Sequence, residues 1–420
     1  MFKKTAKQFE AINLFGDYIE VLLEGGSRSG KTFIEIYAII ARAIKYPGTR
    51  HLCLRRHFNH AKLTLWMQTI PEVFKICFPD IGYKDNKTDY YFEVGGSQIW
   101  IGGTDDKERI EKILGSEWAT IFLNEISQMP YSTYETLKTR LNAPIGVKPL
   151  LMLDQNPPSR SHWSFIKFHE NKNPENKVLL SQEILKNQTY LKMNPEDNRV
   201  NLSAPYIGIL ESLSESRKRR FLYGEYGDDS ENALWKRDWI IKNRVDKTPD
   251  IAKMVVAVDP AVTGNETSNN TGIIPAGRAK VAGEDHYYVF DDRTYHGDVI
   301  GWGQEVVAVY KKYKADKVIG EVNQGGDLVE MNIRNYDRNI PFDSVHATRG
   351  KAMRAEPVAD LYRRGYVHHV GEFPDLEDQM CTWTPESLES PDNMDALVWG
   401  ISYLAGLDTR TGGVGKVVGW

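Results

Sequence analysis

The residues most clearly arranged for chemistry form a glycine-rich loop near the start of the chain. The segment GGSRSGKT has the spacing G-x-x-x-x-G-K-[ST] of a phosphate-binding loop, and it stands between an apolar run, VLLE, and a helical pattern, TFIEIYAIIARAI. In such a loop backbone N–H groups surround phosphate oxygens, Lys31 neutralises charge and the Thr32 hydroxyl ligates Mg²⁺. The sequence therefore predicts an ATP site with one Mg²⁺. Its residues are Gly25, Gly26, Ser27, Arg28, Ser29, Gly30, Lys31 and Thr32.

Two further side chains could contribute to this site, and each has a second interpretation. Arg28 lies inside the loop, where its guanidinium could stabilise charge developing on the γ-phosphate or could only assist binding. Gln8 precedes the first strand at a spacing that could place its amide against adenine, but a glutamine early on an amphipathic helix is usually solvated. We treat Arg28 as a catalytic candidate and Gln8 as a nucleotide-binding candidate.

Two other apolar runs end in polar residues. ATIFLNEIS ends in Asn124 and Glu125, where the first position ordinarily holds Mg²⁺ and the second polarises the attacking water. Glu125 is therefore the expected general base. Asn124 is an amide in place of the usual carboxylate, which predicts a weaker hold on Mg²⁺. KPLLMLDQNP contains Asn156, a candidate for sensing the γ-phosphate, although Asn-Pro also begins turns.

Carboxylates in the second half of the chain stand at the ends of apolar elements. Asp259 closes MVVAVDP, Glu321 closes KVIGEVN, and Asp392 begins the last helical pattern. Such carboxylates are costly unless they are paired or bind metal, and three that converge would suit two Mg²⁺ or Mn²⁺ ions. A pair of such ions at one site can catalyse the hydrolysis of a phosphodiester. Asp395 could complete the set from the same helix face, and Asp392 is equally a plausible helix N-cap.

The elements that must position these residues fall into two patterned regions. Between about residues 18 and 160, apolar runs alternate with amphipathic stretches, which is typical of α/β structure around a mostly parallel sheet. The expected strands there are 18–23, 51–55, 120–123 and 150–153, with a hairpin at 90–103. Beyond residue 250 the runs KMVVAVDPA, HYYVFDDRTY and KVIGEVN predict strands, and 299–313 and NMDALVWGISYLAGL predict helices.

The length of 420 residues predicts two domains. We expect a first domain over 1–227 with a helical subdomain at about 185–227, a linker at 228–250, a second domain over 251–408 and a flexible tail at 409–420. The linker is indicated by charged residues, Asn and Pro between two patterned regions.

Composition is that of a soluble globular protein, with 41% hydrophobic and 26% charged residues. The three cysteines lack paired spacing, so neither a disulfide framework nor a cysteine-rich zinc site is expected. The start lacks the pattern of a secretory signal, and no apolar run approaches the roughly 18 residues of a spanning helix. We therefore expect a protein that neither is exported nor spans a membrane. A net charge of -4 leaves nucleic-acid contacts to local patches such as 217–220, which is equally a solvated helix face.

Together, the segments GGSRSGKT, IFLNEIS, LDQNP, FLYGEYG, AVDPA, GEVNQGGDLV and SPDNMDALVWG resemble, in type and order, the large terminase subunits of tailed bacteriophages. The resemblance spans most of the chain. It implies an N-terminal P-loop ATPase domain of the ASCE, RecA-like class and a C-terminal ribonuclease-H-like nuclease domain. The site residues that it implies are Lys31, Thr32, Glu125 and Arg28 for the ATPase and Asp259, Glu321 and Asp392 for the nuclease. Asn124 departs from the family pattern.

The resemblance also implies a function and partners. ATP hydrolysis would drive double-stranded DNA into a procapsid, and a two-metal endonuclease would cut concatemeric DNA at the start and end of packaging. The expected partners are double-stranded DNA, a small terminase subunit and the portal protein, on which copies of a chain that is monomeric in solution would form a ring. The expected place is the host cytoplasm, transiently at the portal vertex and not in the mature virion.

Two other functions stay open on the sequence. An ATP-dependent helicase or DNA remodeller would bind DNA through its second domain without cutting it, and would need no acidic cluster. A non-enzymatic assembly protein would use bound nucleotide only as a conformational switch, which the neutral Asn124 favours.

Overall fold

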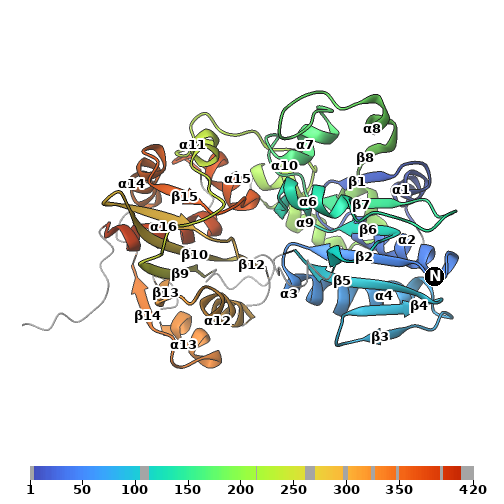
Figure 1. The fold of residues 1–420 in the computed structure, drawn as a ribbon, viewed down its shortest axis with the longest axis horizontal. Coiled ribbons are helices and arrows are strands. Elements are labelled where there is room, and N and C mark those ends of the chain that lie inside the picture. Colours follow the sequence, from blue (N-terminus) through green and yellow to red (C-terminus); the bar gives the residue numbers. More distant parts are fainter. Residues whose placement is uncertain are drawn as a thin grey trace, which may run out of the picture. The chain divides into compact units, whose positions relative to one another are not determined.

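The computed structural model describes residues 4–104, 113–213, 215–260, 270–296, 301–322, 327–346, 350–387 and 391–407 (Figure 1). The chain divides into two compact units, 1–228 and 229–420. The tail expected at 409–420 lies outside the described residues. None of the helices in the described ranges has the length and apolar character needed to cross a membrane.

Over its described residues, the first unit is built on an eight-stranded sheet with the order β3-β4-β5-β2-β6-β7-β1-β8. The strands are β1 Glu20–Glu24, β2 Arg50–Arg55, β3 Lys84–Asn86, β4 Tyr91–Val94, β5 Ser97–Gly103, β6 Thr120–Leu123, β7 Leu150–Gln155 and β8 Gln188–Lys192. The six strands from β5 to β8 in this order pair in parallel, and β3 and β4 extend the sheet in antiparallel fashion. The expected mostly parallel α/β sheet is confirmed.

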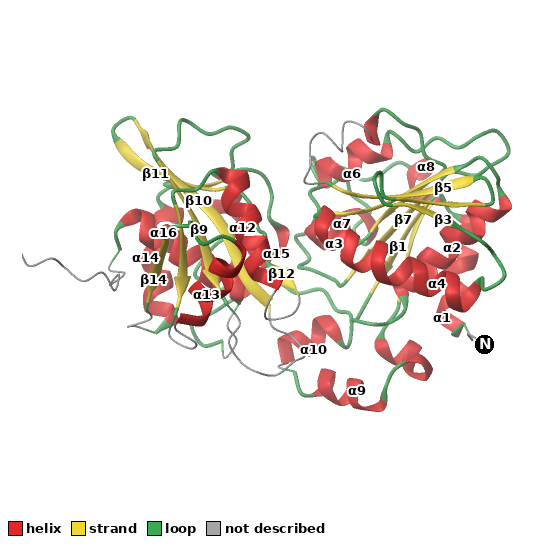
Figure 2. Ribbon diagram, turned by 90° about the horizontal axis from the view of Figure 1, so that it is seen from below, coloured by secondary structure: helices red, strands yellow, loops and turns green. Residues whose placement is uncertain are grey.

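Helices lie on both faces of this sheet (Figure 2). They are α1 Ala6–Asp17, α2 Lys31–Lys45, α3 Phe58–Ala61, η1 Lys62–Thr69, α4 Ile70–Cys77, η2 Ile126–Gln128, α6 Tyr131–Lys138, α7 Trp163–Phe168, α8 Gln182–Asn187, η3 Pro195–Asn201, α9 Ala204–Glu211 and α10 Glu215–Phe221. Successive residues of β1 alternate between two apolar cores: Val21 and Leu23 belong to one, and Leu22 to the other. Because both faces are covered, the central strands are apolar throughout and are easily recognised in the sequence.

The region 185–227, expected to be helical, also contains a strand. Residues 188–192 form β8, which pairs with β1 in parallel and buries Leu191 in the core beside α2. The short alternation in QTYLK was too weak to predict a strand, and the pairing of β8 with β1 supplies the missing specification. The rest of the region forms η3, α9 and α10.

The second unit is built on a mixed sheet with the order β14-β13-β9-β10-β11-β15, to which β12 adds beside β10. The strands are β9 Lys253–Asp259, β10 Asn270–Val281, β11 Glu284–Val289, β12 Tyr295–His296, β13 Lys317–Glu321, β14 Phe342–Val345 and β15 Val367–His369. The helices are α11 Arg237–Lys242, α12 Gly301–Tyr313, α13 Asp327–Tyr336, α14 Lys351–Arg363, α15 Pro374–Thr382 and α16 Asp392–Ala405. β9 again divides two cores, with Val255 and Ala257 in one and Val256 and Val258 in the other.

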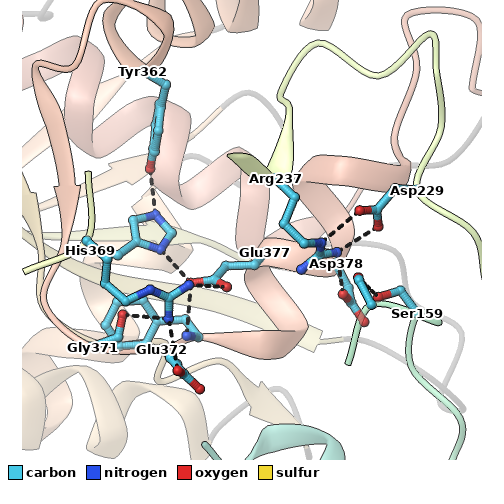
Figure 3. Close-up of polar contacts among 12 residues, drawn as sticks. Ser159, Asp229, Arg237, Tyr362, His369, Gly371, Glu372, Glu377 and Asp378 are labelled. Atoms are coloured by element: carbon cyan, nitrogen blue, oxygen red, sulfur yellow. Dashed lines mark hydrogen bonds and ion pairs between the residues drawn. The ribbon is translucent and has the colours of Figure 1, made fainter. Parts of the chain in front are cut away.

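Residues 229–250, which fall in the expected linker, are packed into the second unit. Trp235 is completely buried in its core. Arg237 donates to Asp229 at 2.8 Å and to Asp378 of α15 at 2.7 Å (Figure 3), and Arg244 donates to Glu377 of α15 at 2.9 Å. The charged residues that made this stretch resemble a linker are therefore the ion-pair partners of a helix.

Candidate functional site

The phosphate-binding loop connects β1 to α2 and is held closely by neighbouring backbone. Gly25 and Gly30 have φ of +140° and +85°. A Cβ on Gly25 would lie 1.9 Å from the Met193 carbonyl oxygen, and one on Gly26 would lie 2.4 Å from that of Phe221. Close contact with the chain therefore requires glycine at positions 25 and 26, and a positive φ favours it at positions 25 and 30.

Lys31 begins α2 with a buried ammonium group. Its Nζ donates to the carbonyl oxygens of Gly25 at 3.1 Å and Gly26 at 2.8 Å, to Ser29 Oγ at 3.1 Å and to Asn156 Oδ1 at 3.3 Å. Burial lowers the pKa of Lys31 to about 8, although the surrounding carboxylates oppose this shift. Phosphate oxygens would offer this ammonium stronger, charged acceptors than the loop carbonyls.

The candidates Gln8 and Arg28 lie against the loop but have partners of their own. Gln8 Oε1 accepts from the Thr5 backbone at 3.0 Å, which caps α1, and its Nε2 lies 3.4 Å from the Gly30 carbonyl oxygen. Arg28 has a left-handed φ of +53°, and its guanidinium lies 5.3 Å from the centre of the Tyr206 ring on α9. The catalytic role of Arg28 and the adenine contact of Gln8 stay predictions.

Thr32, Asn124 and Asp154 form one hydrogen-bonded group beside the loop. Thr32 Oγ1 donates to Asp154 Oδ2 at 2.7 Å, and Asn124 Nδ2 lies 2.8 Å from both oxygens of the same carboxylate. Asp154 is only 2% exposed. Burial raises the pKa of Asp154, and hydrogen bonds from the Glu125 backbone and the Thr32 hydroxyl oppose the rise. The sequence predicted two of these three residues and missed Asp154.

Glu125, the expected base, follows β6 in a left-handed conformation with φ of +58°. Its carboxylate forms an ion pair with Arg55 at the end of β2 and accepts from Gln128 Nε2 at 3.3 Å. Arg55 is 7% exposed, so this cation is a fixed part of the site. It was not predicted, because nothing in the sequence indicates that β2 lies beside β6.

The four acids predicted in the second half of the chain lie near one another. Asp259 and Glu321 end the parallel neighbours β9 and β13, and Asp392 and Asp395 occupy the first turn of α16. Burial and the charges of Asp395, Glu321 and Asp392 raise the pKa of Asp259 well above its ordinary value. The arrangement therefore concentrates negative charge at the end of β9.

Cations of the protein itself balance part of this charge. Lys351 Nζ lies 2.5 Å from Asp395 Oδ2, and Arg354 Nη1 lies 3.7 Å from Glu321 Oε2. Glu321 Oε2 also accepts from Trp399 Nε1 at 2.8 Å. Over the described residues, no three His, Cys, Asp or Glu side chains are placed to hold one metal ion. The carboxylate chemistry suits Mg²⁺ or Mn²⁺, but a metal would have to compete with Lys351 and Arg354.

Asp392 is not the N-cap of α16, which corrects one of the two interpretations of this residue. Pro391 holds that position, and Asp392 is the first helical residue. The backbone there packs on β10 so closely that a Cβ on Gly272 would lie 2.1 Å from the Asp392 carbonyl oxygen. Gly272 is also the partner of Asp259 across β9 and β10. A glycine thus brings the helix start beside the strand that carries Asp259.

Comparison with known proteins gives two matching family models. The model described as terminase large subunit, T4likevirus-type, N-terminal, matches residues 22–242, and the model of the terminase RNaseH-like domain matches residues 256–404. No curated protein matches the chain.

Several solved structures are also similar. The large terminase of a thermophilic bacteriophage has 15% identity and a TM-score of 0.49, with 96% of this chain and 100% of that chain covered. The HK97 bacteriophage large terminase has 12% identity and a TM-score of 0.35, with 96% and 95% covered. The Phi-28 gp11 DNA packaging motor has 11% identity and a TM-score of 0.32, with 94% and 96% covered.

The first family model alone spans more than half of the chain and contains the phosphate-binding loop, and the second contains the acidic cluster. The resemblance stated from the sequence is confirmed. The chain therefore belongs to the phage large terminase subunits of the T4-like type, DNA-packaging motors with an N-terminal ATPase domain and a C-terminal RNaseH-like nuclease domain.

Proposed function

We propose that the first unit hydrolyses ATP with one Mg²⁺ to move double-stranded DNA into a procapsid, and that the second unit cuts this DNA with two Mg²⁺ or Mn²⁺ ions. The hydrogen-bonded group of Thr32, Asn124 and Asp154 beside the phosphate-binding loop supports the first half most strongly. Family membership favours this function over a helicase that does not cut and over a nucleotide switch.

In the ATP site, Lys31 and the loop N–H groups would bind the phosphates. Mg²⁺ would be held by Thr32 together with a polar side chain of the same hydrogen-bonded group, which contains Asn124 and Asp154. Bound Mg²⁺ would neutralise phosphate charge. Glu125 would accept a proton from the attacking water after its carboxylate separates from Arg55. Asn156, already bonded to Lys31, would respond to the γ-phosphate.

We assign the two remaining candidates of this site to the nucleotide itself. Arg28 would leave the Tyr206 ring to stabilise charge on the γ-phosphate. Gln8 would contact adenine from α1 while its oxygen keeps the helix cap.

In the second unit, Asp259, Glu321 and Asp392 would ligate the ions, with Asp395 as a further ligand. Bound ions would supply an activated water and stabilise the leaving 3′ oxygen. Since Lys351 is bonded to Asp395, its ammonium would have to move away from the ligand set.

The partners that fit this function are double-stranded DNA, a small terminase subunit and the portal protein. We propose a ring on the portal assembled from monomers in the host cytoplasm. We also propose that the ATPase domain ends near residue 227 and that the nuclease domain includes the packed stretch after it.

The experiment that tests both halves is plasmid cleavage in Mg²⁺ and Mn²⁺ by the intact protein and by Asp259→Ala, with ATP turnover recorded on the same samples. We expect the variant to lose cleavage and keep turnover. Asp80→Asn, an exposed carboxylate in the first unit, should keep both activities. Absence of metal-dependent cleavage by the intact protein would overturn the nuclease half, and absence of ATP turnover even with DNA and procapsids would overturn the motor half.

A further inference from the structure

The carboxylate that is lacking at position 124 is present on the neighbouring strand. β6 and β7 pair in parallel with Leu123 opposite Leu153. Asn124 follows Leu123, and Asp154 follows Leu153, so the two residues occupy equivalent positions on neighbouring strands. Both lie at the edge of the sheet that faces the phosphate-binding loop.

Donors from three neighbouring residues orient the Asp154 carboxylate. The Thr32 hydroxyl donates to Oδ2 at 2.7 Å, and the Glu125 backbone N–H donates to Oδ1 at 2.7 Å. The Asn124 amide nitrogen lies 2.8 Å from both oxygens. In a phosphate-binding loop the Ser or Thr hydroxyl is a Mg²⁺ ligand, so a carboxylate in contact with this hydroxyl is placed at the metal position.

A second buried acid points to a cation at the same place. Glu35 lies on α2 one turn after Thr32, is completely buried, and has Asp154, a second acid, as the neighbour with which its carboxyl group can share a hydrogen bond. Asp154 is its strongest charged neighbour. Leaving such groups buried without compensation is costly. An additional cation beside Asp154 would reduce this cost.

We propose that Asp154, and not residue 124, supplies the carboxylate that holds Mg²⁺ in the ATP site, and that Asn124 positions this carboxylate through its amide. The proposal rests on the ATPase function proposed above. It replaces the expectation that Asn124 weakens Mg²⁺ binding, since the charge has moved to the adjacent strand and is not lost.

Positions 124 and 154 together carry one amide and one carboxylate. An aspartate at 124 would place a second carboxylate against both oxygens of Asp154, and like charges at this separation repel strongly. An asparagine at 154 alone would leave the site with no carboxylate in contact with Thr32. Exchanging the two residues keeps one carboxylate and one amide in the pair.

The test compares Asp154→Asn, Asn124→Asp and the double exchange with the unaltered protein. Binding of a fluorescent ADP analogue is measured with excess EDTA and in a Mg²⁺ series, and free Mn²⁺ is followed by electron paramagnetic resonance in the presence of ADP. Asp154→Asn should weaken metal binding by about 10- to 100-fold and leave ADP affinity in EDTA nearly unchanged. The double exchange should restore most of the metal binding, and the control Asp80→Asn should match the unaltered protein.

Two outcomes would overturn the proposal. In one, Asp154→Asn retains the full effect of Mg²⁺ on ADP binding; in the other, the double exchange binds metal no better than Asp154→Asn. Should Asp154→Asn fail to fold, the folded double exchange decides, because it keeps the number of buried charges. Failure of the unaltered protein to bind ADP in any condition would overturn the ATP site itself, which distinguishes that failure from the failure of the metal assignment.

Discussion

The ATP site and the acidic cluster both gather carboxylates at the ends of parallel strands, but they balance the charge differently. Asp154 accepts hydrogen bonds from Thr32 and Asn124, which are neutral groups, and the charge of the nearby Lys31 ammonium also stabilises its carboxylate. In the second unit, by contrast, Asp395 and Glu321 face the cations Lys351 and Arg354. Neutral donors can stay in place when a metal binds, whereas cations must give way. We therefore expect metal binding to be a simple addition at the first site and an exchange of cations at the second.

The largest effect that would test the independence of the two sites comes from Glu125→Gln. Loss of the general base should lower ATP turnover by about 10²- to 10⁴-fold. ADP binding and plasmid cleavage should be unchanged, because the acidic cluster is built wholly from the second unit. Turnover and cleavage measured on the same preparation check this, with the exposed Glu72→Gln as control. An equal fall in cleavage would show that the two sites share a component.

Charged contacts outside the acidic cluster also stabilise the second unit, and lowering the pH should reveal their contribution. Burial alone would raise the pKa of Glu377, but the hydrogen bond with His369 (Figure 3) and the charge of Arg244 lower it to about 2. Because this folded-state pKa lies below the ordinary value of 4.5, the stability from Glu377 is complete above pH 4.5 and is lost as the pH falls through about 2. The difference corresponds to about 3 kcal/mol.

Urea unfolding at pH 7, 4.5 and 3 would measure this contribution. Relative to Glu377→Gln, the unaltered protein should lose part of its advantage between pH 4.5 and pH 3. Identical pH profiles for the two proteins would contradict the assigned role. Glu72→Gln, exposed in the first unit, should follow the unaltered protein throughout.

Local sequence patterns predicted the strands that are buried on both faces and missed strands that carry breakers. Thr120–Leu123 is the predicted strand residue for residue. β10 was not predicted, because Gly272, Pro275 and Gly277 interrupt its pattern. It is specified by its pairing with β9 and β11, and its glycines admit close neighbours such as Asp392. This information lies in the packing and is not visible along the chain.

Prediction of the two functional sites from the sequence met the same limit, because contacts made by packing are not visible along the chain. Lys31, Thr32 and the residues that end apolar runs could be chosen because their chemistry follows their position in a strand or loop. Asp154 was seen only as part of DQNP, since its role depends on the register between β6 and β7. Lys351 was missed for a similar reason: it begins α14, and its contact with Asp395 joins residues that are 44 positions apart.

Gly272→Ala would test whether the acidic cluster depends on a close backbone contact. The new Cβ would meet the Asp392 carbonyl oxygen at 2.1 Å, so the start of α16 must move. We expect the free energy of unfolding to fall by about 1–3 kcal/mol and plasmid cleavage to fall with it, while ATP turnover is kept. Gly82→Ala is the control, because an added Cβ there meets nothing within 4 Å. Cleavage at the unaltered rate would show that the position of Asp392 does not limit the reaction.

The smallest effect bears most directly on the difference between the two sites. Lys351→Met removes the cation that lies 2.5 Å from Asp395. The negative charge of the four acids is then less well neutralised without metal, so they should bind metal more readily. For a partly exposed pair we expect metal binding to gain about 1 kcal/mol, which lowers the Mn²⁺ concentration for half-maximal cleavage roughly fivefold. Lys247→Met, at an exposed lysine, should leave this midpoint unchanged. The Mg²⁺ dependence of ADP binding should be the same in all three proteins, because the neutral donors around Asp154 are untouched. If the Mn²⁺ midpoint does not move, Lys351 does not compete with metal, and the contrast between addition at one site and exchange at the other is wrong.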